Sequence, residues 1–215
     1  MKSNEMKKEK AEINPEEIEQ FIIDAGSDDL PTFGGSFEGG IYCQQIPDEI
    51  VPCILAILES GQPVKSYLEI GVAAGGTTFL VNHFFKPEKI ILIDDNMHPK
   101  CSLRAEVLKD ISYIEIIGNS QAEEIVGQII SAGILFDAIL IDGDHSYAGV
   151  KLDIVLYLPF LRIGGFLILH DSVRPEFGVA RVVKELKADL KMEFIGEWAS
   201  KNHPIPCGVA LFRKV

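Results

Sequence analysis

Two apolar runs in the second half of the chain are each followed by aspartate or histidine side chains. Such side chains can bind a metal ion or act as acids and bases. The run FDAILID ends at Asp142, and the run GFLILHD ends at His170 and Asp171. Oxygen ligands suit Mg²⁺, while a histidine shifts the preference toward a transition metal. We therefore expect Asp142, His170 and Asp171 to be candidate ligands of a divalent cation.

A further histidine, His145, lies three residues after Asp142 in the segment DGDHSY. Because imidazole titrates close to neutral pH, His145 is the candidate general base of a reaction at this end of the sheet. The alternative is a packing role for His145, with Asp144 or Ser146 capping the following helix. Asp142 and His145 are thus the candidate catalytic residues.

A glycine-rich turn follows an earlier apolar run, in the segment EIGVAAGGTT that starts at Glu69. Its glycines are spaced GxxxGG, whereas the pyrophosphate-binding turn of dinucleotide enzymes needs GxGxxG. Glycines at this position let the backbone approach a ligand closely. The turn therefore favours a ligand without a pyrophosphate, whose cationic groups would lie near Glu69.

Polar side chains also follow the next two apolar runs. Asp94 ends KIILID, 23 residues after the first glycine of the turn, and Asp95 is its neighbour. An acid there can accept both hydroxyls of a ribose, although the segment could be only a polar turn. Ser120 and Gln121 follow SYIEIIG and could border an adenine pocket, and the same segment could also cap a helix.

The apolar runs that precede these residues alternate with segments long enough for crossover helices. Five runs lie between residues 66 and 171 and are nearly continuous in Ile, Leu, Val, Phe and Tyr. Such runs are typical of strands covered on both faces. Five strand–helix units in succession predict a doubly wound, mostly parallel α/β sheet, whose strand ends share one ligand-binding edge.

The ends of the chain depart from this pattern. The last two strand-like runs, 191–198 and 207–214, are separated by only eight residues, so they should pair antiparallel. At the other end, residues 1–12 predict a mobile charged tail and residues 13–62 a helical extension. The α/β domain is expected over residues 63–215.

Two helices are expected in the extension, over residues 14–25 and 47–60. Asn14 can cap the first of them, and a proline in the first turn suits its start. A long glycine-rich loop with Phe33 and Phe37 lies between the helices. We expect this loop to cover an acceptor pocket as a lid, with an oligomer contact or disorder as the alternatives.

Taken together, these motifs resemble class I S-adenosylmethionine-dependent methyltransferases over residues 41–214. The segments that carry the resemblance are LEIGVAAGGTT, the acid after KIILI, GNSQ, FDAILIDGDHSY and GGFLILHDS. They are most similar to small-molecule O-methyltransferases of the catechol and macrocin types. The resemblance implies a Rossmann-like sheet of seven strands with an antiparallel last strand.

The resemblance also implies a role for each candidate residue. Methyl transfer to a hydroxyl of a small molecule is expected, assisted by Mg²⁺ or another divalent cation. In metal-dependent relatives, acids occupy the strand ends where this chain has His170. Glu69 and the turn would line the methionine end, Asp94 the ribose, and Ser120 and Gln121 the adenine. The residues expected to bind S-adenosylmethionine are Glu69, Gly71, Ala73, Gly75, Asp94, Asp95, Ser120, Gln121 and Asp142.

Charge and composition restrict the expected partners and location. The formal net charge is −12 at pH 7, and an acidic chain repels the phosphate backbone of nucleic acids. No apolar run approaches the roughly 20 residues that span a bilayer. Four scattered cysteines and a charged start without an apolar signal segment predict the cytoplasm. The N-terminal helices offer a surface for a homodimer.

Other functions stay open at this point. An NAD(P)-dependent oxidoreductase of similar layering would need the GxGxxG turn that the sequence lacks. A non-catalytic protein could keep the S-adenosylmethionine pocket without the reaction, but it would be expected to lack Asp142 and His145, which are both present. Some relatives carry hydroxylase names, so the same fold could serve other metal chemistry.

Overall fold

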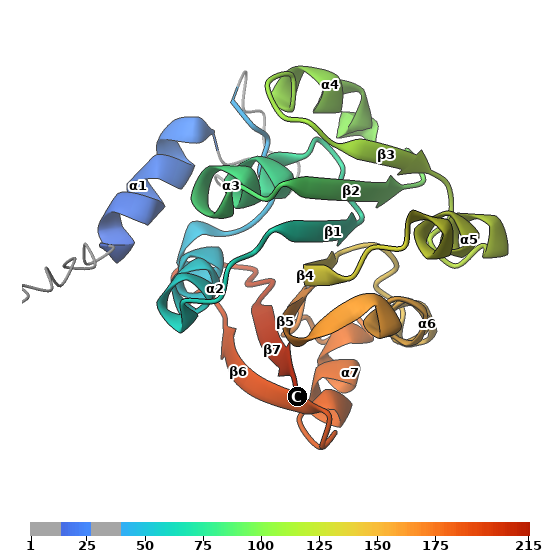
Figure 1. Cartoon of the computed structure of the whole chain (residues 1–215). Helices are drawn as coiled ribbons and strands as arrows, with labels where there is room; N and C mark the ends of the chain where they lie inside the picture. Colours follow the sequence, from blue (N-terminus) through green and yellow to red (C-terminus); the bar gives the residue numbers. More distant parts are fainter. Residues whose placement is uncertain (1–13, 27–39) are drawn as a thin grey trace, which may run out of the picture.

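A seven-stranded sheet forms the centre of the protein in its computed structural model, which describes residues 14–26 and 40–215. The strand order is β3-β2-β1-β4-β5-β7-β6, and β7 runs antiparallel to both neighbours while the other pairs are parallel (Figure 1). This topology confirms the predicted doubly wound sheet with an antiparallel last strand. The strands are β1 Ser66–Ile70, β2 Lys89–Asp94, β3 Ile114–Ile117, β4 Phe136–Ile141, β5 Leu161–His170, β6 Met192–Trp198 and β7 Val209–Lys214.

Helices cover both faces of this sheet, as its strands require because they are apolar on both sides. The helices α1, α2 and α3 pack on one face, and α5, α6 and α7 on the other (Figure 1). The helices of the described residues are α1 Pro15–Ala25, α2 Pro47–Ser60, α3 Gly76–Phe85, α4 Arg104–Val107, α5 Glu123–Ala132, α6 Tyr147–Tyr157 and α7 Val179–Leu186, with short 3-10 turns η1 Pro99–Leu103 and η2 Leu158–Phe160.

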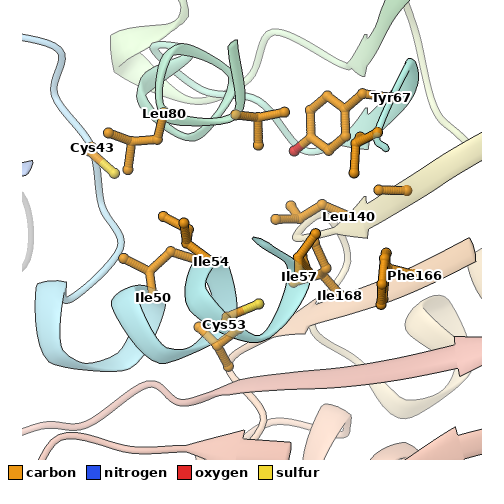
Figure 2. Packing of buried hydrophobic residues seen from close by; sticks show 14 of the residues in the cluster. Cys43, Ile50, Cys53, Ile54, Ile57, Tyr67, Leu80, Leu140, Phe166 and Ile168 are labelled. Carbon is orange, nitrogen blue, oxygen red and sulfur yellow. The ribbon is translucent and has the colours of Figure 1, made fainter. Parts of the chain in front are cut away.

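Side chains along a strand point alternately to the two faces of the sheet, so the hydrophobic core consists of two clusters, one on each face. In β1, Tyr67 joins the cluster beneath α2, whereas Leu68 and Ile70 join the cluster beneath α5, α6 and α7. Figure 2 shows Ile54 and Ile57 of α2 in the first cluster together with Tyr67. Each fully buried side chain of this size contributes about 2 kcal/mol. The strand ends that carry the polar residues are therefore anchored from both sides.

The N-terminal helices lie where the sequence predicts them. Oδ1 of Asn14 accepts a hydrogen bond of 3.0 Å from a backbone N–H in the first turn of α1, which confirms Asn14 as its cap. Residues 1–13, which include the expected tail, lie outside the described residues. So do residues 27–39, with Phe33 and Phe37 of the expected lid, and the lid stays a prediction.

A buried carboxylate ties α2 to the connection between β6 and β7. Glu49 is fully buried, and its carboxylate accepts backbone hydrogen bonds from Ser200 (2.7 Å), Cys207 (3.2 Å) and Gly208 (2.8 Å). Desolvation raises the pKa of Glu49 against the opposing effect of these donors. The helix α2 is thus bonded directly to the sheet, and the expected domain boundary at residue 63 stays a prediction.

Replacing Glu49 should loosen this connection. We expect Glu49→Ala to lower the free energy of unfolding by about 3 kcal/mol, because three buried backbone N–H groups lose their acceptor. Urea unfolding followed by circular dichroism measures the change. Glu59→Ala, on the exposed last turn of the same helix, is the matched control and should stay within about 0.5 kcal/mol of the parent. Equal stabilities of the two variants would contradict this role of Glu49.

Candidate functional site

A cavity of about 440 Å³ opens at the carboxyl ends of β1, β2, β4 and β5. This is the edge at which ligands bind in open α/β sheets, and the volume suits a ligand of small-molecule size. Its lining includes most of the residues singled out in the sequence. They are Glu69, Gly71, Ala73, Asp94, Asp95, Ser120, Gln121, Asp142, His145, His170 and Asp171, together with Tyr42, Gln44, Gln45 and His98 from other segments.

The glycine turn has no room for side chains where it crosses β4. Gly71 has φ +81°, and a Cβ on it would lie 2.1 Å from the carbonyl oxygen of Asp142. Gly75, with φ +88°, begins α3, and its N–H donates to the carbonyl of Val72 (2.8 Å). Ala73 between them also has a positive φ of +47°. The backbone of the turn, rather than its side chains, therefore forms this wall of the cavity.

The carboxylate of Asp94 organises the glycine turn. Its Oδ2 accepts hydrogen bonds from the backbone N–H groups of Val72 (2.6 Å) and Ala73 (2.9 Å), and its Oδ1 accepts one from Asn96 (2.7 Å). Burial would raise the pKa of Asp94, but these donors and the guanidinium of Arg104 outweigh it and lower the pKa. Asp94 lies at the cavity wall, and its expected contact with a ribose stays a prediction.

The sequence analysis missed Arg104, which lies beneath the turn. Arg104 is buried, with its guanidinium 3.0 Å from Asp94, and its Nε donates to the carbonyl of Ala73 (2.9 Å). It also pairs with Glu115 of the neighbouring strand region. No sequence pattern could have revealed this partner, because Arg104 begins the short helix α4 and only the fold brings it beneath Asp94. The neighbouring Asp95 is exposed.

Glu69 is the most strongly perturbed acid in the wall of the cavity. It is 1% exposed, and its Oε2 accepts hydrogen bonds from the hydroxyls of Tyr67 (2.8 Å) and Thr78 (2.6 Å). Burial raises the pKa of Glu69 to about 8, despite these two donors. Glu69 is therefore largely protonated at neutral pH, which the sequence could not indicate.

The residues expected around an adenine are bonded to α6. The hydroxyl of Ser120 donates to the carboxylate of Asp153 (2.7 Å), and Nε2 of Gln121 donates to the carbonyl of Gly149 (3.3 Å). Asp153 is fully buried, and burial raises its pKa to about 6. These bonds fix the cavity wall at the end of β3. The direct contacts with adenine stay a prediction.

Four titratable side chains converge at the ends of β4 and β5. Nδ1 of His170 lies 3.0 Å from Oδ1 of Asp142, and Nε2 of His145 lies 3.4 Å from the same oxygen. Nε2 of His145 also lies 3.3 Å from Oδ2 of Asp171. The ring of His145 packs against the ring of Phe177 with centroids 4.6 Å apart. His145 thus lies between two carboxylates, next to an aromatic ring.

The charged forms of Asp142 and the two histidines stabilise one another and shift one another's pKa values. A hydrogen bond with Asp142 raises the pKa of His145 against partial burial. Burial would lower the pKa of His170, but the nearby carboxylate of Asp142 raises it well above its ordinary value. Burial would raise the pKa of Asp142, and the two histidines lower it instead. Burial raises the pKa of Asp171.

The structure brings the expected metal ligands together, with Nδ1 of His170 3.0 Å from Asp142 and 3.6 Å from Asp171, and their binding of a metal stays a prediction. His170 directs Nδ1 at Asp142, and Gln45 donates to the other oxygen of that carboxylate (3.2 Å). Among the described residues, two groups of three have ligand atoms all within 4.8 Å of one another. They are Asp142, His145 and Asp171, and His170, Asp171 and Cys207. Nitrogen and sulfur in these sets suit a transition metal better than Mg²⁺.

Comparisons with known proteins agree with this geometry. Residues 68–172 match a family model described as a methyltransferase domain. No curated protein matches the chain. The family match confirms the prediction of a methyltransferase, and it disfavours the NAD(P)-dependent oxidoreductase.

Solved structures of methyltransferases share the fold. The O-methyltransferase TomG from Streptomyces achromogenes, in complex with SAM, is 16% identical with a TM-score of 0.61, and the match covers 77% of this chain and 80% of TomG. An O-methyltransferase from Bacillus cereus in complex with SAH is 15% identical with a TM-score of 0.62, over 94% and 90% of the two chains.

A third structure with this fold carries a metal. The MycE methyltransferase of the mycinamycin biosynthetic pathway, in complex with Mg and SAH, is 21% identical with a TM-score of 0.54. The match covers 76% of this chain and 48% of MycE. At such identities the comparison shows the shared fold, while the chemistry has to be argued from the site.

Gly71→Ala should show how tightly the turn packs on β4. We expect the free energy of unfolding to fall by about 2 kcal/mol or more, because the new Cβ meets backbone atoms as well as an unfavourable φ. The matched control is Gly133→Ala, where φ is +62° and nothing lies within 4 Å of the added Cβ. That variant should lose only about 1 kcal/mol. Equal losses in chemical denaturation would refute the close approach.

The raised pKa of Glu69 predicts a pH-dependent stability. Because its pKa is about 8 in the folded protein and near 4.5 when exposed, its protonated form favours folding. Its contribution is complete below about pH 4.5 and is lost as pH rises through 8, by up to about 1.4 kcal/mol per pH unit.

Glu69→Gln removes this titration and keeps an acceptor for the two hydroxyls. We expect the variant to lose less stability than the parent between about pH 5 and 8, as measured by urea unfolding at several pH values. Glu59→Gln, at an exposed position, should keep the parent's slope. If Glu69→Gln has that slope as well, Glu69 is ionised in the folded protein.

Proposed function

Residues 68–172 of this chain belong to a family of methyltransferase domains, and on this premise we propose that the protein transfers the methyl group of S-adenosylmethionine to a hydroxyl of a small molecule. The observation that carries the proposal is the placement of His145 between two carboxylates, in the same cavity that the glycine turn lines. A methyl donor and a base then have separate places at one sheet edge.

The donor end is supported by the shape of the glycine turn. The turn lies so close to the end of β4 that only a glycine fits at position 71. Backbone groups of Gly71 therefore line the cavity. The turn lacks the GxGxxG spacing that holds a pyrophosphate. Glu69 at its start is largely protonated at neutral pH, and a cationic group of a ligand beside it would favour its ionised form. TomG is in complex with SAM, and the Bacillus cereus enzyme is in complex with S-adenosylhomocysteine (SAH).

The acceptor end is supported by His145. S-adenosylmethionine supplies an activated methyl group, so the protein has to orient the acceptor and remove its proton. Nε2 of His145 faces Asp142 and Asp171, which leaves Nδ1 to accept the proton of the hydroxyl. The two carboxylates then stabilise the imidazolium as the new O–CH₃ bond forms and the S–CH₃ bond breaks.

A small acceptor fits the cavity and the charge of the chain. The cavity is also lined by Tyr42, Gln44, Gln45 and His98, which offer one aromatic ring and several polar groups, and Gln45 donates to Asp142. A net charge of −12 opposes a nucleic-acid acceptor. Among the described residues, no helix combines the length and apolar character needed to cross a membrane. The cytoplasmic location and the homodimer stay predictions.

Calorimetric titration of the full chain tests the donor assignment. We expect SAH to bind with a dissociation constant on the order of micromolar, as is common for enzyme ligands, and NAD not to bind. Binding of NAD without binding of SAH would overturn the proposal.

Transfer of a radiolabelled methyl group to a panel of phenols, sugars and amines tests the acceptor. We expect labelled ethers, and we expect His145→Gln to reduce their formation by about 10²- to 10⁴-fold while SAH still binds. His203→Gln, outside the cavity, is the control. Labelled amines without ethers would refute the hydroxyl acceptor, and SAH binding without any transfer would favour a non-catalytic protein.

A further inference from the structure

Three buried side chains meet behind the acceptor end of the cavity, at the junction of β5 and β7. His170 ends β5, Asp171 follows it, and Cys207 lies just before β7. Their exposed fractions are 5%, 3% and 1%, and one ligand atom of each lies within 4.8 Å of the others. We call these three residues the rear cluster. The proposed methyl transfer assigns no role to the Cys207 thiol or to the rear cluster as a whole.

The two ring nitrogens of His170 have different surroundings. Nδ1 lies 3.0 Å from Oδ1 of Asp142 and 3.6 Å from Oδ2 of Asp171, while Nε2 is buried. The thiol of Cys207 is close enough to hydrogen-bond with the ring. Histidines that bind metals commonly donate their other N–H to a carboxylate, which fixes the ring and its tautomer. Asp142 has this position relative to His170, and it leaves Nε2 as the ligand atom.

The other two members are held by the backbone around them. Asp171 has φ +58°, an unusual conformation for a non-glycine residue, and its Oδ1 is buried without a hydrogen-bond partner in the described chain. Strained backbone of this kind persists where the surrounding structure fixes it. The carbonyl of Cys207 accepts from Val173 (3.1 Å), and its N–H donates to Glu49 (3.2 Å). The thiol is therefore held in place beside Asp171 before any ligand arrives.

We propose that the rear cluster is a transition-metal site that holds Zn²⁺, Fe²⁺ or a similar ion through Nε2 of His170, a carboxylate oxygen of Asp171 and Sγ of Cys207. One nitrogen, one oxygen and one sulfur ligand are typical of such ions and unsuited to Mg²⁺, which takes oxygen ligands in octahedral geometry. A thiolate and a carboxylate together balance the two charges of the ion. Three protein ligands leave a fourth position of a tetrahedral site open.

His170 and Asp171 both line the cavity, so an ion held by them would border it. An ion held there would be a Lewis acid for a ligand oxygen. The competing group of Asp142, His145 and Asp171 shares only Asp171 with the rear cluster. An ion in the rear cluster leaves His145 free as a base. The proposal concerns metal binding alone and does not depend on methyl transfer.

Cobalt titration of the full chain, first stripped with a chelator, tests the site without a methyl donor. We expect one equivalent of Co²⁺ to produce visible d–d bands of a tetrahedral site and a thiolate-to-cobalt charge-transfer band in the near ultraviolet. Zn²⁺ should displace the Co²⁺, and excess Mg²⁺ should not. Cys207→Ser should abolish the charge-transfer band and weaken Co²⁺ binding at least about tenfold.

Cys53→Ser is the matched control, since Cys53 is equally buried and belongs to neither group of candidate ligands. It should keep both the band and the affinity. Asp142→Asn should weaken Co²⁺ binding by about 10- to 100-fold with the band retained, because it changes only the partner of His170. If Cys207→Ser does not fold by circular dichroism, His170→Gln and Asp142→Asn carry the test.

Three results would overturn the proposal. Stoichiometric Co²⁺ binding without a thiolate band would assign the ion to Asp142, His145 and Asp171. An unchanged band in Cys207→Ser would exclude this thiol. Failure of Co²⁺ and Zn²⁺ to bind would mean that the cluster is only a packed polar group. SAH binding, measured separately, distinguishes each of these results from a failure of the proposed methyltransferase function.

Discussion

The glycine turn keeps its shape because the carboxylate of Asp94 accepts the N–H groups of Val72 and Ala73. These donors would otherwise point into the cavity without partners, and unsatisfied buried donors are costly. Arg104 binds the carboxylate from behind and the carbonyl of Ala73 at the same time. The turn can therefore pass within contact distance of the end of β4 at Gly71, next to Asp142 of the cavity wall.

Buried charge is tolerated in this protein where the backbone or a second charge compensates it. Glu49 receives three backbone N–H groups, and Asp94 receives three together with a guanidinium. Glu69 has only two hydroxyl donors, and its pKa is accordingly raised to about 8. The comparison shows why two buried acids at the same cavity have opposite pKa shifts. At Asp94, three peptide N–H groups together with a guanidinium outweigh desolvation, whereas two hydroxyls at Glu69 do not, and the peptide N–H groups at Glu49 do not either.

The proposed base and the proposed metal site lie close together at the ends of β4 and β5. Asp142 contacts both histidines, so it connects the proposed base His145 with His170 of the rear cluster. The histidine at the end of β5 would make the proposed ligand set softer than one of carboxylates alone. The proposed thiol ligand Cys207 comes from the antiparallel strand pair that closes the sheet. The C-terminal hairpin thereby contributes to the site as well as to the core.

The sequence by itself determined the sheet, the strand ends and the residues that lie there. The apolar runs and the GxxxGG turn that indicate them are patterns of residues close together in the sequence. It also predicted the cap at Asn14. It could not predict that Arg104 lies beneath Asp94, or that Cys207 reaches Asp171. These partners come from distant segments, and side-chain orientation at a strand end depends on the packing of its neighbours. The pKa shifts likewise exist only after tertiary burial removes water from each carboxylate.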